Sequence, residues 1–134
     1  MSTEALPKMS QDTVADTLNR MMNALRARKP ELTVKTHSKF LLSVLAIAKL
    51  KGYVESYHID SNTKLLKIKL GKLNGCNAIK PRFIVKKDDI EKYTKRYLPA
   101  RNLGILIIST SQGLVTHQTA LEKNLGGSLI AYFF

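Results

Sequence analysis

The chain has 134 residues, a formal net charge of +12 and a single cysteine, Cys76. This length fits one domain or two small lobes that share a core, and one cysteine excludes an internal disulfide framework. Hydrophobic residues make up 44% of the chain, which excludes wholesale disorder, and no apolar run is long enough to span a bilayer.

The positive charge indicates an anionic partner, and nucleic acid fits the charge and size best. Twenty of the 22 Lys and Arg residues lie between Arg20 and Arg101, whereas the segment from Asn102 to Phe134 holds one acid and one base. The alternatives to nucleic-acid binding are a soluble protein with a merely basic surface and a protein that binds a membrane surface. No predicted helix combines a basic face with a large exposed apolar face, which membrane binding needs. The first residues lack the pattern of a secretory signal, so we expect a cytosolic setting.

The first half of the chain is predicted to form a lobe of the order α-β-α-β-β. Residues 1–10 form a flexible tail, and a helix capped by Ser10 or Asp12 runs to about Arg28. A strand over residues 32–36 precedes a buried central helix that Ser38 caps and Gly52 closes. Strands over residues 53–59 and 64–70 then form a hairpin, which leaves Lys67 and Lys69 on a cationic sheet face or edge.

The second half is predicted to be mostly β-structure with short helices. A boundary near residue 71 is followed by a strand over 78–85 that Pro81 interrupts, and by a helix over 89–97 that Asp88 caps. A central apolar strand over 104–108, a strand over 114–116, a short helix over 117–124 and a strand over 129–134 complete the chain. The whole is an α+β protein with an N-terminal lobe at 11–70 and a C-terminal lobe at 71–134.

The most distinctive segment is a hydroxyl-rich turn that is followed by a glycine pair: Ser109, Thr110, Ser111, Gln112 and Gly113, then Gly126 and Gly127. Hydroxyl groups both donate and accept hydrogen bonds, so they can contact base edges and ribose 2′-hydroxyls, and glycine lets a partner approach the backbone. The alternatives are an ordinary Ser/Thr turn after a strand and a tight glycine loop that needs positive φ. The residues alone leave these alternatives open.

A basic cluster is predicted to contact phosphates, with a solvated, solubility-giving face as the alternative. Its members are Lys64, Lys67, Lys69, Lys72, Lys80, Arg82, Lys86 and Lys87. Base stacking is one interpretation of four tyrosines. The favoured interpretation is that their rings are half-buried and their hydroxyl groups contact water. These tyrosines are Tyr53, Tyr57, Tyr93 and Tyr97.

Catalysis is disfavoured by the lack of any motif around the nucleophilic and basic residues. Cys76 has no motif partner, and His37, His58 and His117 show neither nucleophilic nor metal-binding spacing. Function as a small enzyme that uses Cys76 or His117 is therefore the least favoured interpretation. We expect no cofactor and no metal.

Three motifs carry a family resemblance: GKLNGCNAIKPRF at 71–83, RYLPARNLGILIISTSQG at 96–113 and LGGSLIAYFF at 125–134. The chain resembles the eighth universal protein of the small ribosomal subunit, in its archaeal and eukaryotic-type form. The family usually has proline after its first aspartate, where this chain has Thr13. The resemblance implies two tightly apposed α/β lobes. Nothing in the sequence suggests a dimer interface, so we expect a monomer when the protein is free.

The same resemblance implies a non-enzymatic protein of the cytoplasmic ribosome that binds an irregular stem in the central domain of small-subunit rRNA. It would help to assemble that domain beside neighbouring ribosomal proteins, and a translational repressor that binds an mRNA mimic is the alternative. The C-terminal lobe would make the main contact through the STSQG segment and the glycine pair. Further contacts are expected at Asn19, Arg20, Asn23, Ser38, Lys39, Lys72, Lys80, Arg82 and Arg101.

Overall fold

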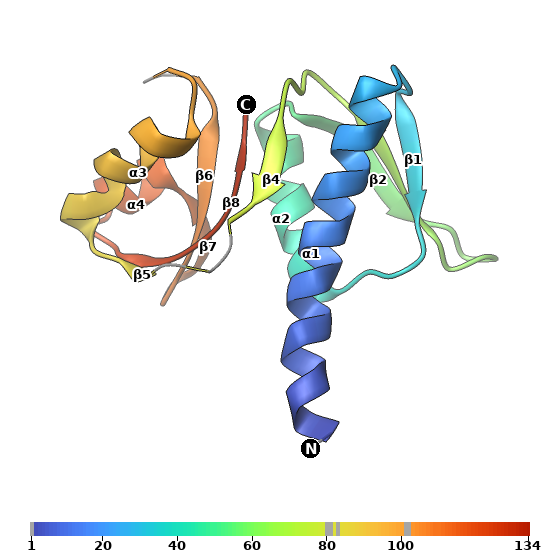
Figure 1. Cartoon of the computed structure of the whole chain (residues 1–134), viewed down its shortest axis with the longest axis horizontal. Coiled ribbons are helices and arrows are strands. Elements are labelled where there is room, and N and C mark those ends of the chain that lie inside the picture. Colours follow the sequence, from blue (N-terminus) through green and yellow to red (C-terminus); the bar gives the residue numbers. More distant parts are fainter. Residues whose placement is uncertain (1, 80–81, 83, 101–102) are drawn as a thin grey trace. The chain divides into compact units, whose positions relative to one another are not determined.

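The structure is a computed structural model that describes residues 2–79, 82, 84–100 and 103–134, with side chains from residue 13 onward (Figure 1). It divides into two compact units, a first unit up to Leu73 and a second unit from Asn74 to Phe134. Each unit has its own antiparallel sheet, so the fold is the predicted α+β type.

The first unit packs two helices against one side of a three-stranded sheet (Figure 1). Its elements are α1 (Ser2–Arg26), β1 (Glu31–Val34), α2 (Lys39–Leu50), β2 (Val54–Ile59) and β3 (Leu66–Leu70), and the strand order is β1-β3-β2. The alternating apolar residues of β3, Leu66, Ile68 and Leu70, are buried, which places Lys67 and Lys69 on the exposed side as predicted.

Helix α1 begins at Ser2, which is earlier than the start predicted at Ser10 or Asp12. Glu4, Ala5 and Leu6 are strong helix formers, and their intrinsic preference accounts for the earlier start even though Pro7 interrupts the backbone hydrogen bonds within it. Helix α2 follows its prediction at both ends. Its first turn is capped by Ser38, and Gly52 has a φ of 89° just after its last residues.

One side of α2 is less buried than predicted. Its buried residues are Leu41, Val44, Leu45 and Ala48, which recur at helical spacing and form a single stripe. Leu50 lies two positions beyond Ala48, on the opposite side of the helix, and is 81% exposed. The helix is therefore amphipathic rather than buried all round.

The second unit is built around strand β8, which pairs with three other strands. Its elements are β4 (Cys76–Ala78), β5 (Ile84–Val85), the 3-10 turn η1 (Lys87–Asp89), α3 (Ile90–Tyr97), β6 (Ile105–Thr110), β7 (Gly113–Thr116), α4 (His117–Glu122) and β8 (Gly127–Phe133). The order is β4-β8-β6-β7, with β5 also on β8. Strand β6 lies inside the sheet, as its apolar run predicted.

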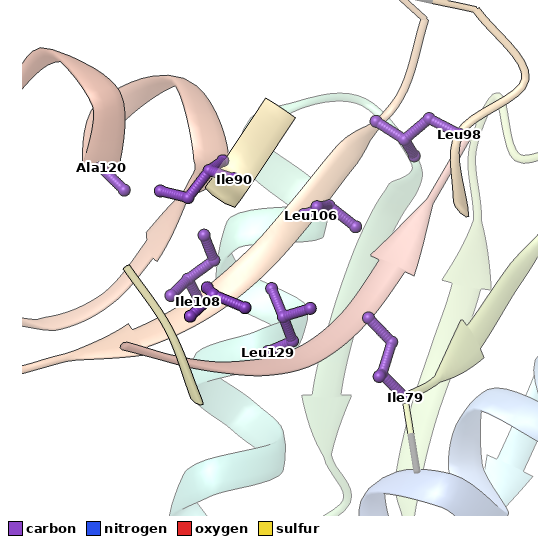
Figure 2. Packing of buried hydrophobic residues seen from close by; sticks show 8 residues of the cluster. Ile79, Ile90, Leu98, Leu106, Ile108, Ala120 and Leu129 are labelled. Atoms are coloured by element: carbon purple, nitrogen blue, oxygen red, sulfur yellow. The ribbon is translucent and has the colours of Figure 1, made fainter. Parts of the chain in front are cut away.

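Helices α3 and α4 lie together on one side of this sheet (Figure 1), and a buried cluster fills the space beneath them. Figure 2 shows Leu106, Ile108 and Leu129 on the side of the sheet that faces Ile90 and Ala120. Leu106, Ile108 and Leu129 are fully buried. They come from β6 and β8, so the pairing of these two strands fixes the core of the unit.

Two predictions for this unit are corrected. The strand predicted over 78–85 is two short strands, β4 and β5, which pair with different parts of β8, and Pro81 lies outside the described residues. Asp88 does not cap α3, because it lies inside the 3-10 turn that leads into the helix. The residue before α3 is Asp89, whose φ of −93° and ψ of −8° are helical, whereas a capping side chain needs an extended backbone.

Candidate RNA interface

Strands β6 and β7 are joined by a two-residue hairpin turn, Ser111-Gln112, and the last strand pair is Thr110 with Gly113. Ser109 and Thr110 therefore belong to the strand rather than to the predicted turn. The Thr110 hydroxyl donates to the Gly113 carbonyl oxygen at 2.9 Å and accepts from the Gln112 N–H at 3.1 Å. Thr110 thus holds the turn closed, and the exposed Ser111 and Gln112 lie at its tip.

Gly113 is the glycine of this turn that needs its conformational freedom. Its φ of 99° lies in the left-handed region, which a residue with a Cβ adopts only with strain. No heavy atom lies within 4 Å of the place where its Cβ would stand. The backbone at this position is therefore open to a partner.

The glycine pair serves close packing rather than a tight loop with positive φ, which corrects that alternative interpretation. A Cβ on Gly127 would collide with the carbonyl oxygen of Ser109, and one on Gly126 would stand 2.6 Å from the carbonyl oxygen of Val85. The φ of neither glycine lies in the left-handed region. The two glycines thus let β8 begin tightly against β6 and β5, which brings both distinctive sequence segments to one end of the sheet.

Strand pairing aligns four side chains across that end of the sheet. Leu114 pairs with Ser109, Ser109 with Ser128, and Ser128 with Ile84. Directly paired residues point to the same side of a sheet, so Ser109 and Ser128 stand side by side between two apolar residues. We call these four residues the hydroxyl row. Both serines are half-buried, and within the described part of the chain no hydrogen bond involves either hydroxyl group.

Ser128 is not among the predicted site residues. It follows Gly127 directly, but nothing in its local sequence distinguishes it from an ordinary strand serine. Only the register of β6 against β8 places it beside Ser109. The available signal was the two-residue alternation of β8, which puts Ser128 on the side opposite the buried Leu129.

Lysines from the predicted basic cluster lie next to the glycine pair. Lys86 and Lys87 are exposed and follow β5, and the Cα of Lys86 stands 3.2 Å from the position of a Gly126 Cβ. Arg82 is half-buried, and this burial lowers the pKa of its guanidinium. Lys80 and Arg101, which were also expected to contact RNA, lie outside the described residues.

The remaining members of the basic cluster belong to the first unit, and carboxylates lie close to two of them. Lys67 Nζ is 3.8 Å from an Asp60 carboxylate oxygen, and Lys69 Nζ is 3.7 Å from one of Glu55. A hydrogen bond from the Asn62 backbone N–H lowers the pKa of the Asp60 carboxyl and keeps it charged. The outer face of this sheet is therefore less cationic than its lysines alone predicted.

Helix α1 exposes the three residues expected to bind RNA in the first unit, Asn19, Arg20 and Asn23. Arg20 lines a hollow of about 300 Å³ together with Lys35 and Thr36, which were not among the predicted site residues, and with the acidic Asp16. The Lys72 side chain is exposed after β3 and that of Lys39 at the start of α2. Ser38, by contrast, has a structural role, because its hydroxyl accepts the Leu41 N–H at 3.2 Å as the cap of α2.

The two residues considered for catalysis, Cys76 and His117, are both buried. Cys76 is buried, and burial raises the pKa of its thiol to about 12, so the thiolate is not formed near neutral pH. The buried His117 accepts the Leu106 backbone N–H at its Nδ1 atom, at 3.1 Å. Among the described residues no group of three His, Cys, Asp or Glu side chains forms a metal site.

Three of the four tyrosines considered for base stacking, Tyr57, Tyr93 and Tyr97, have rings that contact groups of the chain itself. Lys49 lies over the Tyr57 ring, and Lys92 and Arg96 lie over Tyr93. Tyr97 stacks on Tyr132 with ring centroids 5.5 Å apart. These contacts favour a packing role for the rings.

In the part of the chain that the structure describes, no helix has the length and apolar character to cross a membrane.

The fold and site define a small basic α+β protein whose second unit presents hydroxyl groups at one end of a sheet. The chain belongs to the family described as Ribosomal protein S8, which it matches over residues 12–134. It is similar to the small ribosomal subunit protein uS8 of Nanoarchaeum equitans (strain Kin4-M), with 42% identity over 129 residues that cover 94% of this chain and 100% of that protein. The predicted family resemblance is confirmed, and the family is a structural kind of protein rather than an enzymatic one.

Proposed function

We propose that this chain is a structural protein of the small ribosomal subunit that binds rRNA directly through the hydroxyl row and the adjoining Ser111-Gln112 turn. The observation that carries the proposal is the pairing of β6 with β8, which sets Ser109 beside Ser128. The net charge of +12 and the family membership support an RNA partner. The site offers short neutral groups next to cations, which is the combination that RNA recognition uses.

The hydroxyl groups suit the geometry of RNA. A-form RNA hides its base edges in a deep major groove and presents 2′-hydroxyls and base edges on a shallow side. Serine hydroxyls donate and accept, so Ser109, Ser111 and Ser128 can bond either kind of group. Gly113 has no side chain to hold the RNA away from the turn. The surface therefore fits an irregular stem whose minor groove or unpaired bases lie against it.

The lysines beside the site hold phosphates. Lys86 and Lys87 are exposed where β5 approaches Gly126, so they flank the hydroxyl groups without entering the row. Each lysine that neutralises a phosphate releases a counterion and makes the affinity more dependent on salt. In this arrangement the lysines supply affinity and the serines supply selectivity.

The first unit adds a second contact. Arg20 and Lys35 line one hollow, and Asn19 and Asn23 are exposed on the same helix as Arg20. Lys39 follows at the start of α2. These residues bind the RNA backbone, whereas Ser38 stabilises α2 instead of binding RNA. The RNA is the central domain of small-subunit rRNA, and binding there helps to assemble that domain beside neighbouring ribosomal proteins.

The test is a salt titration of binding to a central-domain rRNA fragment and to an unrelated stem. Ser111→Ala should lose ~1–3 kcal/mol of binding free energy for the fragment if its hydroxyl bonds a buried RNA group, with no change in the salt dependence. Lys86→Ala should lower the slope of log K against log salt by about one. Ser61→Ala, at another exposed serine in a hairpin turn, is the matched control and should bind as the wild type does.

Two results would contradict the proposal. Equal binding of the wild type to both RNAs, with purely salt-dependent affinity, would mean that the charge alone drives binding. Normal binding of Ser111→Ala together with weak binding of the lysine variants would remove the turn from the interface.

A further inference from the structure

Ile84 is the most exposed of the large apolar side chains in the described part of the chain, at 85%. It is one of the two residues of β5, and its neighbour Val85 is buried in the core beneath α3 and α4. Because successive strand residues point to opposite sides of a sheet, burying Val85 directs Ile84 outward. Its exposure therefore follows from the strand geometry.

The position of Ile84 is fixed by the sheet rather than left to a loose loop. Its strand pairs with β8 at Ser128, and the next pair joins Val85 to Gly127. Gly126 packs so closely against the Val85 carbonyl oxygen that a Cβ would not fit. An isoleucine held in this way pays little conformational entropy when a partner covers it.

Ile84 also forms one end of the hydroxyl row. Along the row the order is Leu114, Ser109, Ser128 and Ile84, so an exposed apolar surface adjoins a pair of hydrogen-bonding groups. Lys86 and Lys87 lie two and three residues further along the chain and are exposed. An apolar contact, hydrogen-bonding groups and cations thus meet at one place.

A nucleotide that has left its helical stack presents the same three features. Its base has an apolar face, its edges carry donors and acceptors, and its backbone carries a phosphate. We propose that Ile84 packs against the face of an unstacked nucleotide of the bound RNA while the Ser128 hydroxyl bonds the edge or ribose of that nucleotide. This inference rests on the proposed rRNA binding, and it assigns to two residues of the hydroxyl row their separate contacts with one nucleotide.

The experiment compares three variants in binding to the central-domain rRNA fragment at several salt concentrations. Ile84→Ser removes the apolar contact and should weaken binding about tenfold, since the large aliphatic side chain is no longer there to be removed from water by the RNA. Ile84→Val keeps most of the apolar surface and should stay within about fourfold of the wild type. Leu50→Ser changes an apolar residue of the first unit that is 81% exposed, and it should bind normally.

The salt dependence distinguishes this contact from a phosphate contact. The slope of log K against log salt should be the same for Ile84→Ser and the wild type, because no counterion is released at an isoleucine. Replacing Ile84 with the photoreactive residue benzoylphenylalanine should yield a cross-link to a single unpaired nucleotide of the fragment. Urea unfolding should be unchanged in the Ile84→Ser variant, since substitutions at exposed positions change stability little.

The outcomes separate this inference from the proposed function. If the wild type does not prefer the fragment to an unrelated stem, rRNA binding itself is refuted. If the wild type prefers the fragment and Ser111→Ala weakens binding, but Ile84→Ser binds as tightly as the wild type, the isoleucine contact alone is overturned. A cross-link to duplex nucleotides only, or a reduced salt slope in Ile84→Ser, would also overturn it.

Discussion

Thr110 and Ser111 are adjacent hydroxyl residues for which the structure predicts opposite consequences of substitution. The Thr110 hydroxyl makes two hydrogen bonds that close the hairpin turn, at 2.9 Å and 3.1 Å. Ser111 is exposed at the tip. Thr110→Val, which keeps the shape of the side chain and removes its hydrogen bonds, should lower the free energy of unfolding, whereas Ser111→Ala should leave it unchanged.

The size of the effect follows from the two bonds. A typical intramolecular hydrogen bond contributes about 0.5–1.5 kcal/mol net, and both bonds lie in a turn that water reaches. We therefore expect Thr110→Val to lose about 1–2 kcal/mol. The turn also becomes less ordered, so RNA must organise Ser111 on binding, and affinity should fall by up to about tenfold.

The assay is urea unfolding of the wild type and of each variant, followed by titration with the rRNA fragment. Thr110→Ser keeps the hydroxyl and is the matched control, which should recover most of the stability and the affinity. The reasoning would be refuted if Thr110→Val unfolded at the same urea concentration as the wild type. It would equally fail if Ser111→Ala lost stability in proportion to its loss of RNA affinity.

Three further predictions concern packing, capping and pH. Gly127→Ala should lose about 2–3 kcal/mol in urea unfolding because its Cβ collides with the Ser109 carbonyl oxygen, and an unchanged midpoint would contradict this packing. Ser38→Ala should lose about 1 kcal/mol of stability while Ser38→Asp retains it, and a selective loss of RNA affinity would contradict the capping role. The pKa of Cys76 rises from 9.0 to about 12 in the folded chain, so its stabilising effect is complete below pH 9 and is lost as the pH rises toward 12. At pH 10 this loss is on the order of 1 kcal/mol, and Cys76→Ala should remove that part of the pH dependence.

The elements of this fold could be predicted where a local pattern decides them. Alternation in β3, the cap at Ser38 and the glycine after α2 are signals within a few residues, and each was confirmed. The errors arose where a competing local preference acted. Helix formers extended α1 to Ser2, and a 3-10 turn took Asp88 out of the capping position.

The candidate site was predictable only in part, because its members come from separate strands. Sequence composition identified Ser111 and Gly113, but it could not show that Thr110 is engaged within the turn. It could not place Ser128 or Ile84 either, since the registers of β8 on β6 and of β5 on β8 join residues far apart in the chain. Long-range register depends on packing across the whole sheet.

The register also explains why the glycines and the hydroxyl groups occur together. Gly127 packs against the carbonyl oxygen of Ser109, and the residue after it is Ser128, the partner of Ser109 across the sheet. A side chain at Gly127 would push β8 away from β6 and separate the two hydroxyl groups that the proposed interface needs. The glycine therefore acts on RNA binding through the position of the strands, so Gly127→Ala should weaken RNA binding even though a glycine offers RNA no side chain. Gly113→Ala, where a Cβ meets no neighbouring atom, should act only through its backbone and through direct obstruction of the RNA.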